Sequence, residues 1–545
     1  MADSSEPAFL FLYRKEAVAP VDYLSTFATA PYYFKNPSKG GPRLKKHAYF
    51  IGIDNGGSAI KAAVFNENGR ELSVSQVQIP MDHPNPGWTE RDPHAVWRGN
   101  CQVIRDAIGK AQICAQDIKG VSVCGYGGGL GLLDSANSPI APFIVSTDTR
   151  AQSLLGEYSK NGINSRLYQL TLQNLWAGQQ AMLLPWLKKH QPDLLKQACH
   201  MVCIKDYIRY CLTGMLATDY TDASCTNLFN IRDKQFDPEI FELLDIREYF
   251  RLACVPILQS FETGGFVTSQ AAIQCGLPEG IPVAAGLYDV DSCCLASGIL
   301  DSSCLCLITG TWSINEYLTD DLEECIGKNG NTIAFLPDYY IIEESSPTSA
   351  SNFDWYADHF LSRMYPGLER RELYDYCNKS ILESGLKQTD ILFMPYLFAS
   401  NSVPDAKGAF LNLDSSHSPM DILLAIYEGI LFSSCYHIEK LTGTIHPQKQ
   451  IRLSGGITNS PVWTQILADI LQLPIQVMEG KERGALGAAI CASVACEYYP
   501  DFHSAVKKMC HLSRTYIPDS SKAVFYKEKY EKFKKAIQAL EVFYK

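Results

Sequence analysis

Several signatures of nucleotide, metal and membrane binding are missing from this chain of 545 residues. The P-loop pattern GxxxxGK(S/T) does not occur, and the glycine-rich segment 125–129 misses the spacing of a GxGxxG dinucleotide motif. No CxxC pair is matched by a second one, which disfavours a structural zinc site. No stretch approaches the roughly 20 apolar residues of a membrane span. An excess of basic residues is also absent, with 48 Lys and Arg against 59 Asp and Glu, so we predict neither a nucleic-acid partner nor a membrane.

The composition is that of a globular protein with a sizeable core, since 46% of the residues are hydrophobic and 20% are charged. The length suggests three or four domains and leaves two large ones open. The 19 cysteines are scattered among apolar runs, and the nearest cluster is Cys199-His200 with Cys203. Free thiols in a reducing compartment explain this pattern better than a metal. The first seven residues are acidic and Phe9–Tyr13 is too short for a signal-peptide core, so we expect a cytoplasmic protein.

A unit of strand, glycine turn and strand occurs twice. The first spans residues 48–54, the turn 55–58 and residues 60–65; the second spans 305–309, the turn 310–311 and 313–318. Two such hairpins suggest a duplicated architecture. Helices are predicted from Asp92-Pro93 and from Ser460-Pro461 onward, and residues 484–496 predict a helix of small residues suited to close packing. Strands alternating with helices indicate an α/β fold.

Asp54 ends the first strand immediately before a glycine turn. Glycine lets the backbone approach a ligand and present N–H groups to an anion, but a carboxylate beside that cradle would repel bare phosphate. A Mg²⁺ ion would remove this conflict, so the combination suggests a Mg²⁺-nucleotide. A plain hairpin with a surface aspartate is the alternative, and these residues alone do not exclude it.

Five blocks occur in an order that resembles the FGGY carbohydrate kinases. They are residues 54–61, residues 86–93, Gly286-Leu287-Tyr288-Asp289, Gly310-Thr311-Trp312 and residues 454–459. Among the members of that family the resemblance is greatest to those that act on L-xylulose. It implies two actin-like ATPase domains, each ribonuclease-H-like, with an active site in the cleft between them. The expected divisions are a loosely structured extension 1–46, an N-terminal domain 47–298, a C-terminal domain 299–500 and a helical tail 501–545.

The resemblance also implies roles for residues that bind ATP and Mg²⁺. Two loops from opposite domains would hold the phosphates, Lys61 would lie near the γ-phosphate, and Asp54 would be the Mg²⁺-associated carboxylate. The predicted phosphate-loop residues are Gly56, Gly57 and Ser58 in one loop and Thr309, Gly310 and Thr311 in the other. The adenosine would lie at Gly455, Gly456 and Asn459.

The resemblance implies that Asp289 is the general base, a role that suits a positioned carboxylate, which can take the proton of a poorly nucleophilic sugar hydroxyl. Asp291 would share a face with it in an extended segment. Either aspartate could instead be an ordinary helix cap.

The candidate sugar contacts are Glu90, Tyr126, Gly128 and Asp148, together with the base Asp289. Gly128 replaces a polar or basic residue of several relatives, and Asp148 could either bind a polyol or pair with Arg150. We therefore predict ATP-dependent phosphorylation of a primary hydroxyl of a ketopentose, with L-xylulose first and D-xylulose, a keto-gulonate or another polyol as alternatives. A non-catalytic nucleotide switch is the alternative from another class, and a homodimer is left open.

Overall fold

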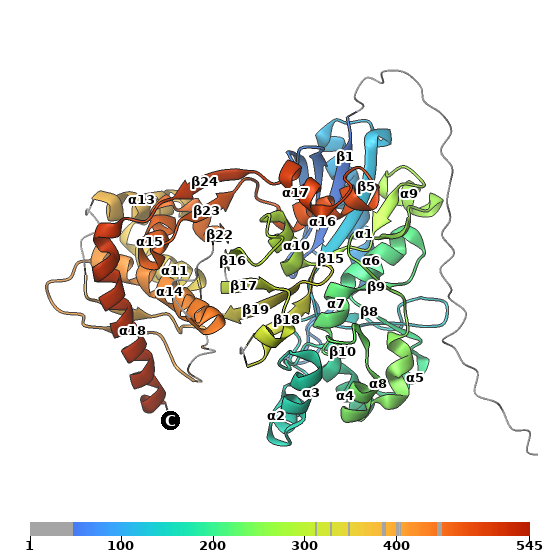
Figure 1. Cartoon of the computed structure of the whole chain (residues 1–545), viewed down its shortest axis with the longest axis horizontal. Helices are drawn as coiled ribbons and strands as arrows, with labels where there is room; N and C mark the ends of the chain where they lie inside the picture. Colours follow the sequence, from blue (N-terminus) through green and yellow to red (C-terminus); the bar gives the residue numbers. More distant parts are fainter. Residues whose placement is uncertain are drawn as a thin grey trace, which may run out of the picture. The chain divides into compact units, whose positions relative to one another are not determined.

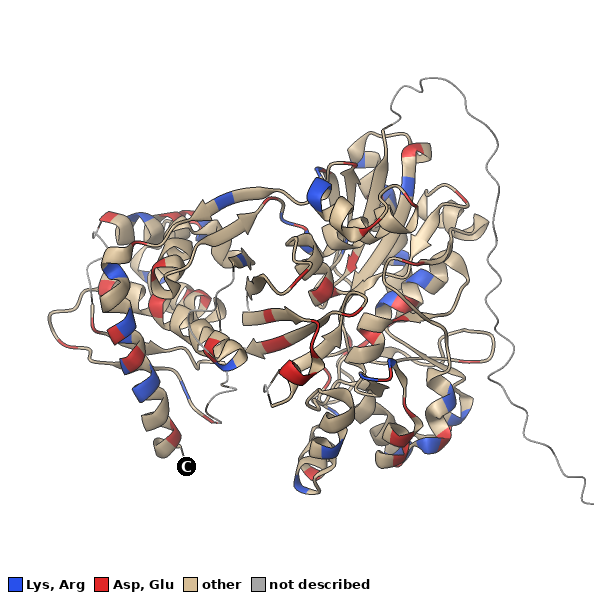
Figure 2. Cartoon of the chain, viewed as in Figure 1, with Lys and Arg blue, Asp and Glu red and all other residues tan. Residues whose placement is uncertain are grey.

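The computed structural model describes residues 47–310, 313–327, 330–346, 349–383, 389–398, 400, 403, 405–443 and 450–544. The predicted extension 1–46 lies outside these residues. Within them, two mixed sheets form the frame of the molecule (Figure 1). We call the parts built on them the first lobe and the second lobe. Acidic and basic residues are interspersed over both lobes, so neither carries charge of a single sign (Figure 2).

The first sheet has the strand order β13-β14-β5-β1-β2-β3, and β15 also pairs with β5. Strands β1, β2 and β3 are antiparallel neighbours, and β5 runs parallel to β1 on its other side. The hairpin predicted around residues 55–58 is therefore confirmed. The bounds are β1 Tyr49–Asn55, β2 Ile60–Asn66, β3 Glu71–Val77, β5 Ile118–Gly125, β13 Thr263–Phe266, β14 Pro282–Ala284 and β15 Leu287–Tyr288.

The second sheet repeats this plan with the order β18-β19-β17-β16-β22-β23-β24. β16 and β17 form the second predicted hairpin, and β22 runs parallel to β16. In both sheets an antiparallel hairpin is followed by parallel strands, so the predicted duplication is confirmed. The bounds are β16 Cys304–Thr309, β17 Ser313–Thr319, β18 Asn331–Ala334, β19 Tyr340–Ser346, β22 Gln450–Ser454, β23 Ile475–Met478 and β24 Leu512–Tyr516.

Helices surround both sheets, and the two predicted helix starts are confirmed. Asp92 accepts from the backbone N–H groups of His94 and Ala95 at the start of α1, and Ser460 accepts from Trp463 N at the start of α15. The longer helices are α1 Pro93–Ala111, α2 Gln152–Lys160, α3 Ile163–Thr171, α4 Gln180–His190, α6 Ile204–Thr213, α10 Asp289–Ala296, α13 Arg370–Glu383, α14 Pro419–Thr442, α15 Pro461–Leu471, α16 Arg483–Ala495, α17 Phe502–Met509 and α18 Ala523–Phe543.

Short elements complete the described chain. The short helices are α5 Pro192–Gln197, α7 Tyr220–Cys225, α8 Pro238–Leu243, α9 Ser269–Cys275, α11 Ser351–Tyr356 and α12 Ser362–Met364. The short strands are β4 Glu90–Arg91, β6 Gly131–Leu133, β7 Phe143–Ile144, β8 His200–Val202, β9 Thr218–Asp219, β10 Phe229–Asn230, β11 Gln235–Phe236, β12 Ile257–Leu258, β20 Leu392–Met394 and β21 Ala409–Leu411.

α16 packs on the first sheet although it lies in the chain between β23 and β24 of the second (Figure 1). The small residues that predicted this helix allow the backbones to touch. A Cβ added at Gly52 of β1 would lie 1.7 Å from the carbonyl oxygen of Ala485, and one at Gly120 of β5 would lie 2.8 Å from that of Ala492. The chain thus returns to the first lobe and closes its core there.

α14 is the exception to the expectation that no stretch is long and apolar enough to span a membrane. It has 24 residues, its most apolar window has a mean hydropathy of 1.2, and 83% of that window is buried inside the protein. By length and composition this helix could span a membrane, so the expectation is wrong in this respect. Its burial is that of a core helix, because both its faces pack against protein.

Candidate active site

A cavity of about 1020 Å³ lies between the two lobes. The first lobe contributes Tyr126, which follows β5, together with Trp176 and Asp289, and the second lobe contributes Glu343 and Ser345 from β19. A cavity of this size with a few polar groups pointing inward is typical of a small-molecule site.

Asp289 lies at the start of α10, directly after β15, and lines this cavity. Burial, with smaller contributions from the carboxylates Asp54 and Glu343, raises the pKa of its carboxyl to about 7. Asp291 lies inside the same helix and is fully buried. The expectation that these two aspartates share a face is wrong, because residues two apart in a helix point about 200° apart.

Asp54 lies at the end of β1 and has a free acceptor. Its Oδ1 atom is buried and has no hydrogen-bond partner among the described residues. Burial raises the pKa of Asp54 to about 6, although Lys61 opposes this. A Cβ at Gly484 of α16 would lie 2.7 Å from Asp54 Oδ2, so the small residue leaves room for the carboxylate. A buried oxygen without a partner is the donor that a hard cation such as Mg²⁺ prefers, so the residues fit this ion.

The first glycine loop is held from behind by Arg91, which is buried. Arg91 Nη1 donates to the carbonyl oxygen of Gly56 at 3.4 Å, and Nη2 donates to that of Gly57. A Cβ at Gly57 would meet no atom within 4 Å. The loop is therefore anchored through its carbonyls while space remains beside it. Arg91 could not be predicted as an anchor of this loop, because an arginine in a short strand carries no local sign of the loop it holds.

Lys61 of β2 bonds to a residue that lies far along the chain. Its Nζ atom is 2.7 Å from Glu482 Oε2, just before α16. Burial lowers the pKa of Lys61, but the hydrogen bond and charge of Glu482 outweigh it, so the pKa is raised overall. Ser58 follows the loop glycines and is exposed.

The second loop and the predicted adenosine segment contact each other. Thr309 at the end of β16 donates from Oγ1 to the carbonyl oxygen of Ser454 at 3.2 Å. Gly455 has φ 91° and ψ −176°, and a Cβ there would lie 2.4 Å from the carbonyl oxygen of Thr309. At Gly310 and Gly456 an added Cβ would meet nothing within 4 Å. Asn459 ends the short helix Gly456–Asn459, and Thr311 lies outside the described residues.

One of the predicted sugar contacts, Tyr126, lines the cavity, and a second, Gly128, packs against a residue that does. Tyr126 is buried, and burial raises the pKa of its hydroxyl to about 12. Gly128 has φ 71°, and a Cβ there would lie 2.4 Å from the ring of Trp176. Trp176 itself lines the cavity. Gly128 therefore lets the tryptophan ring close against the backbone.

The other two predicted contacts are bound within the protein. Asp148 accepts from Thr89 N at 2.7 Å and from Arg150 Nε and Nη2, both at 2.9 Å. Arg150 Nη2 also donates to Glu90 Oε1 at 2.7 Å, and its guanidinium lies 4.0 Å from the ring centre of Trp88. Of the two interpretations of Asp148 and Arg150, the structure shows their pairing, although the pair is buried and not at the surface.

These features define a class of protein: two sheets of the same plan, each with a glycine turn in its first hairpin, have a cavity between them that is lined by the carboxylate of Asp289, as in a two-lobed phosphotransferase. Comparison with known proteins agrees. Residues 49–296 match the N-terminal domain, and residues 305–496 the C-terminal domain, of the FGGY family of carbohydrate kinases. The chain belongs to this family and is a carbohydrate kinase.

Two relatives are similar over almost their whole length. The probable L-xylulose kinase of Haemophilus influenzae is 34% identical over 90% of this chain and 99% of its own. The L-xylulose/3-keto-L-gulonate kinase of Escherichia coli is 32% identical over 91% of this chain and 98% of its own.

Solved structures confirm the predicted two-lobed actin-like fold. The gluconate kinase from Lactobacillus acidophilus matches 91% of this chain and 98% of its own with a TM-score of 0.81 and 22% identity. The xylulose kinase from Rhodospirillum rubrum matches 91% and 99% with a TM-score of 0.80 and 23% identity.

Proposed function

We propose that this carbohydrate kinase transfers the γ-phosphoryl group of ATP to the primary hydroxyl of L-xylulose, giving L-xylulose 5-phosphate and ADP. The observation that supports it most is Asp289, a carboxyl of raised pKa at the wall of the cavity between the two lobes. The names of the relatives from Haemophilus influenzae and Escherichia coli support the sugar. The second of these names also makes 3-keto-L-gulonate the alternative substrate.

In this proposal Asp289 accepts the proton of the sugar hydroxyl as the phosphoryl group leaves ATP. A base with a pKa near the working pH is ionised in a substantial fraction of the molecules and is basic enough for this step, and a value of about 7 meets that condition. Tyr126 and Trp176 orient the sugar from the cavity wall. The pair of Asp148 and Arg150, with Glu90, holds the segment behind that wall in place.

The two glycine loops hold the phosphates through backbone N–H groups, with Gly56–Ser58 on one side and Thr309–Thr311 on the other. Lys61 adds positive charge, and Gly455, Gly456 and Asn459 border the adenosine. Asp54 would hold Mg²⁺, which would neutralise charge on the phosphate oxygens. Most of the acceleration then comes from alignment and charge neutralisation, because the transition state of phosphoryl transfer is loose.

The deciding experiment is an ADP-release assay with L-xylulose, D-xylulose, 3-keto-L-gulonate and a set of polyols. We expect the highest kcat/KM with L-xylulose. Asp289→Asn should lower kcat by a factor of about 100 or more, within the range that general base catalysis supplies. Asp291→Asn is the matched control, because Asp291 is a buried carboxyl of the same helix that does not line the cavity. The substrate assignment fails if no ketopentose is turned over, and the base assignment fails if Asp289→Asn keeps full activity.

Three broader proposals accompany this function. We infer functional divisions at 47–298 and 299–500 with a tail 501–545, a cytoplasmic location where ATP is available, and a requirement for Mg²⁺. The 19 cysteines, none of them in a disulfide, support a reducing compartment. A homodimer stays a prediction, which light scattering of the purified protein would test.

A further inference from the structure

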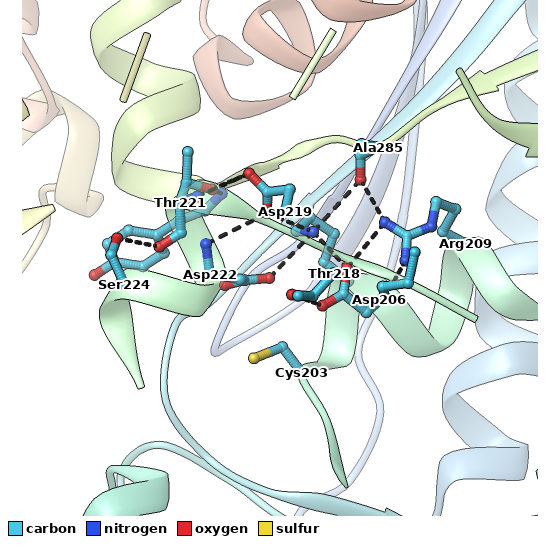
Figure 3. Close-up of polar contacts among 12 residues, drawn as sticks. Cys203, Asp206, Arg209, Thr218, Asp219, Thr221, Asp222, Ser224 and Ala285 are labelled. Carbon is cyan, nitrogen blue, oxygen red and sulfur yellow. Dashed lines mark hydrogen bonds and ion pairs between the residues drawn. The ribbon is translucent and has the colours of Figure 1, made fainter. Parts of the chain in front are cut away.

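A cluster of charged side chains lies inside the first lobe, completely shielded from solvent (Figure 3). Lys205 Nζ of α6 is 2.6 Å from Asp206 Oδ1, 2.9 Å from Asp219 Oδ1 and 3.3 Å from Asp222 Oδ2. Arg209, one helical turn on, is 3.0 Å from Asp206 Oδ1. We call Lys205, Asp206, Arg209, Asp219 and Asp222 the buried charge cluster. The sequence analysis singled out none of these residues, and the active-site proposal does not use them.

The cluster reaches the segment that leads into Asp289. Asp219 Oδ2 accepts a hydrogen bond from Thr221 Oγ1 at 2.7 Å, which turns the hydroxyl proton toward the carboxylate. The lone pairs of that hydroxyl then accept a hydrogen bond from the backbone N–H of Tyr288 at 2.8 Å. Tyr288 is the residue immediately before Asp289.

The same cluster holds the other end of this segment. The carbonyl oxygen of Ala285 accepts from Arg209 Nη1 at 3.0 Å and from Lys205 Nζ at 3.4 Å. Between the two anchor points, Gly286 has φ 88°, and a Cβ there would lie 2.1 Å from the carbonyl oxygen of Val123. Residues 285–288 therefore pack closely against β5. The buried charge cluster bonds to Ala285 at one end of the segment directly and to Tyr288 at the other end through Thr221.

Stability alone gives a poor account of this arrangement. Removing several charges from water costs folding free energy, and well-packed apolar residues of similar volume often stabilise a protein as well or better. What charges add is direction, because ion pairs and hydrogen bonds fix the orientation of the groups that they join, even though Arg209 Nε and Asp222 Oδ1 have no hydrogen-bond partner among the described residues. Here the cluster orients the hydroxyl of Thr221, which in turn fixes the backbone N–H of Tyr288, the residue before Asp289.

We propose that Thr221, oriented by Asp219 and Lys205 of the buried charge cluster, is a positioning residue that sets the place of Asp289 in the cavity. The inference rests on the proposed function, in which Asp289 is the general base. A displacement of about 1 Å in a reacting group can lower a rate about 100-fold. Loss of the anchor at Tyr288 should therefore lower the rate of the chemical step and leave nucleotide binding unchanged.

The test compares Thr221→Val with Thr226→Val. Thr226 is also buried, lies at the end of the same helix α7, and its hydroxyl also donates one hydrogen bond and accepts one, to Ala223 O and from Leu228 N. We expect Thr221→Val to lower kcat about 10-fold with the KM for ATP within about twofold of wild type. Thr226→Val should keep kcat within about twofold, and Thr221→Ser, which keeps the hydroxyl, should restore most of the rate.

Two results would overturn the inference. One is equal kcat in Thr221→Val and Thr226→Val; the other is a rise in the KM for ATP that matches the loss of kcat, which indicates general damage to the lobe. Circular dichroism and melting curves establish that each variant is folded. If Thr221→Val does not fold, Thr221→Ala against Thr226→Ala decides in the same way.

Failure of this inference can be told apart from failure of the proposed function. If Asp289→Asn is inactive while Thr221→Val behaves like its control, only the positioning role is refuted. If Asp289→Asn keeps its activity, the base assignment falls and the positioning role falls with it.

Discussion

Replacing Gly455 by alanine should push this residue away from Thr309. These two residues belong to the two segments of the second lobe that we propose bind the nucleotide. Gly455 has φ 91° and ψ −176°, a region of backbone conformation that is almost restricted to glycine. Holding another residue there costs about 1–3 kcal/mol. The new Cβ would also lie 2.4 Å from the carbonyl oxygen and 2.9 Å from the nitrogen of Thr309, and backbone atoms cannot swing aside. We expect Gly455→Ala to lower the free energy of unfolding by about 2–4 kcal/mol in total and to raise the KM for ATP.

Gly456→Ala is the matched variant, because the neighbouring residue begins a short helix and an added Cβ meets nothing within 4 Å. Its fold should be as stable as wild type within about 0.5 kcal/mol, since alanine is accepted in a helical turn. The KM for ATP should still rise, because the methyl group enters the space assigned to the adenosine. Urea denaturation and ADP-release kinetics measure the two effects. The reasoning is refuted if both variants lose the same stability, and Gly456 is not at the nucleotide if the KM is unchanged.

Three further predictions concern buried carboxyls. Asp54→Asn should raise the Mg²⁺ concentration for half-maximal activity about tenfold or more in a metal titration, and an unchanged requirement would count against Asp54 as the metal carboxylate. Lys529→Met in α18 leaves Glu428 of α14 buried without its ion-pair partner and should lower the free energy of unfolding, measured with urea, by about 3–5 kcal/mol. Adding Glu428→Leu to the same chain should restore most of this loss. A loss below about 1 kcal/mol in Lys529→Met alone would contradict this. Burial raises the pKa of Glu343 from 4.5 to about 7, so the folded protein binds more protons than the unfolded one between these values, and stability falls as the pH rises through them. Glu343→Gln should remove up to about 3 kcal/mol of that fall between about pH 5 and about pH 8, whereas an equal fall in both proteins would show that Glu343 is not its source.

Local patterns were sufficient for the helices and hairpins that the sequence predicted. The two hairpins, the caps at Asp92 and Ser460 and the small-residue helix α16 depend on residues close together in the chain. The placement of α16 depends on contacts between Gly52 and Ala485, which no periodicity records. The length and apolar character of α14 were also missed, because scattered polar residues interrupt its apolar run.

The site also has one part that local sequence predicts and another that only folding brings together. The first glycine turn and Asp54 are adjacent in sequence, so their chemistry could be predicted together. The carbonyls that Arg91 holds and the partner of Lys61 come from other elements, and only folding brings them together. For Asp289 and Asp291 the local structure itself was predicted wrongly, since they were expected in an extended segment and instead lie in the first turn of a helix.

The packing of α16 on β1 and β5 has a consequence for synthesis of the chain. A ribosome delivers both strands long before residues 483–495, so the sheet face around Gly52 and Gly120 stays uncovered while the whole second sheet up to β23 emerges. Contacts between such distant segments form late. The first lobe therefore completes its core only when the chain is nearly finished, and a fragment that stops before α16 would present a bare apolar surface to chaperones and proteases.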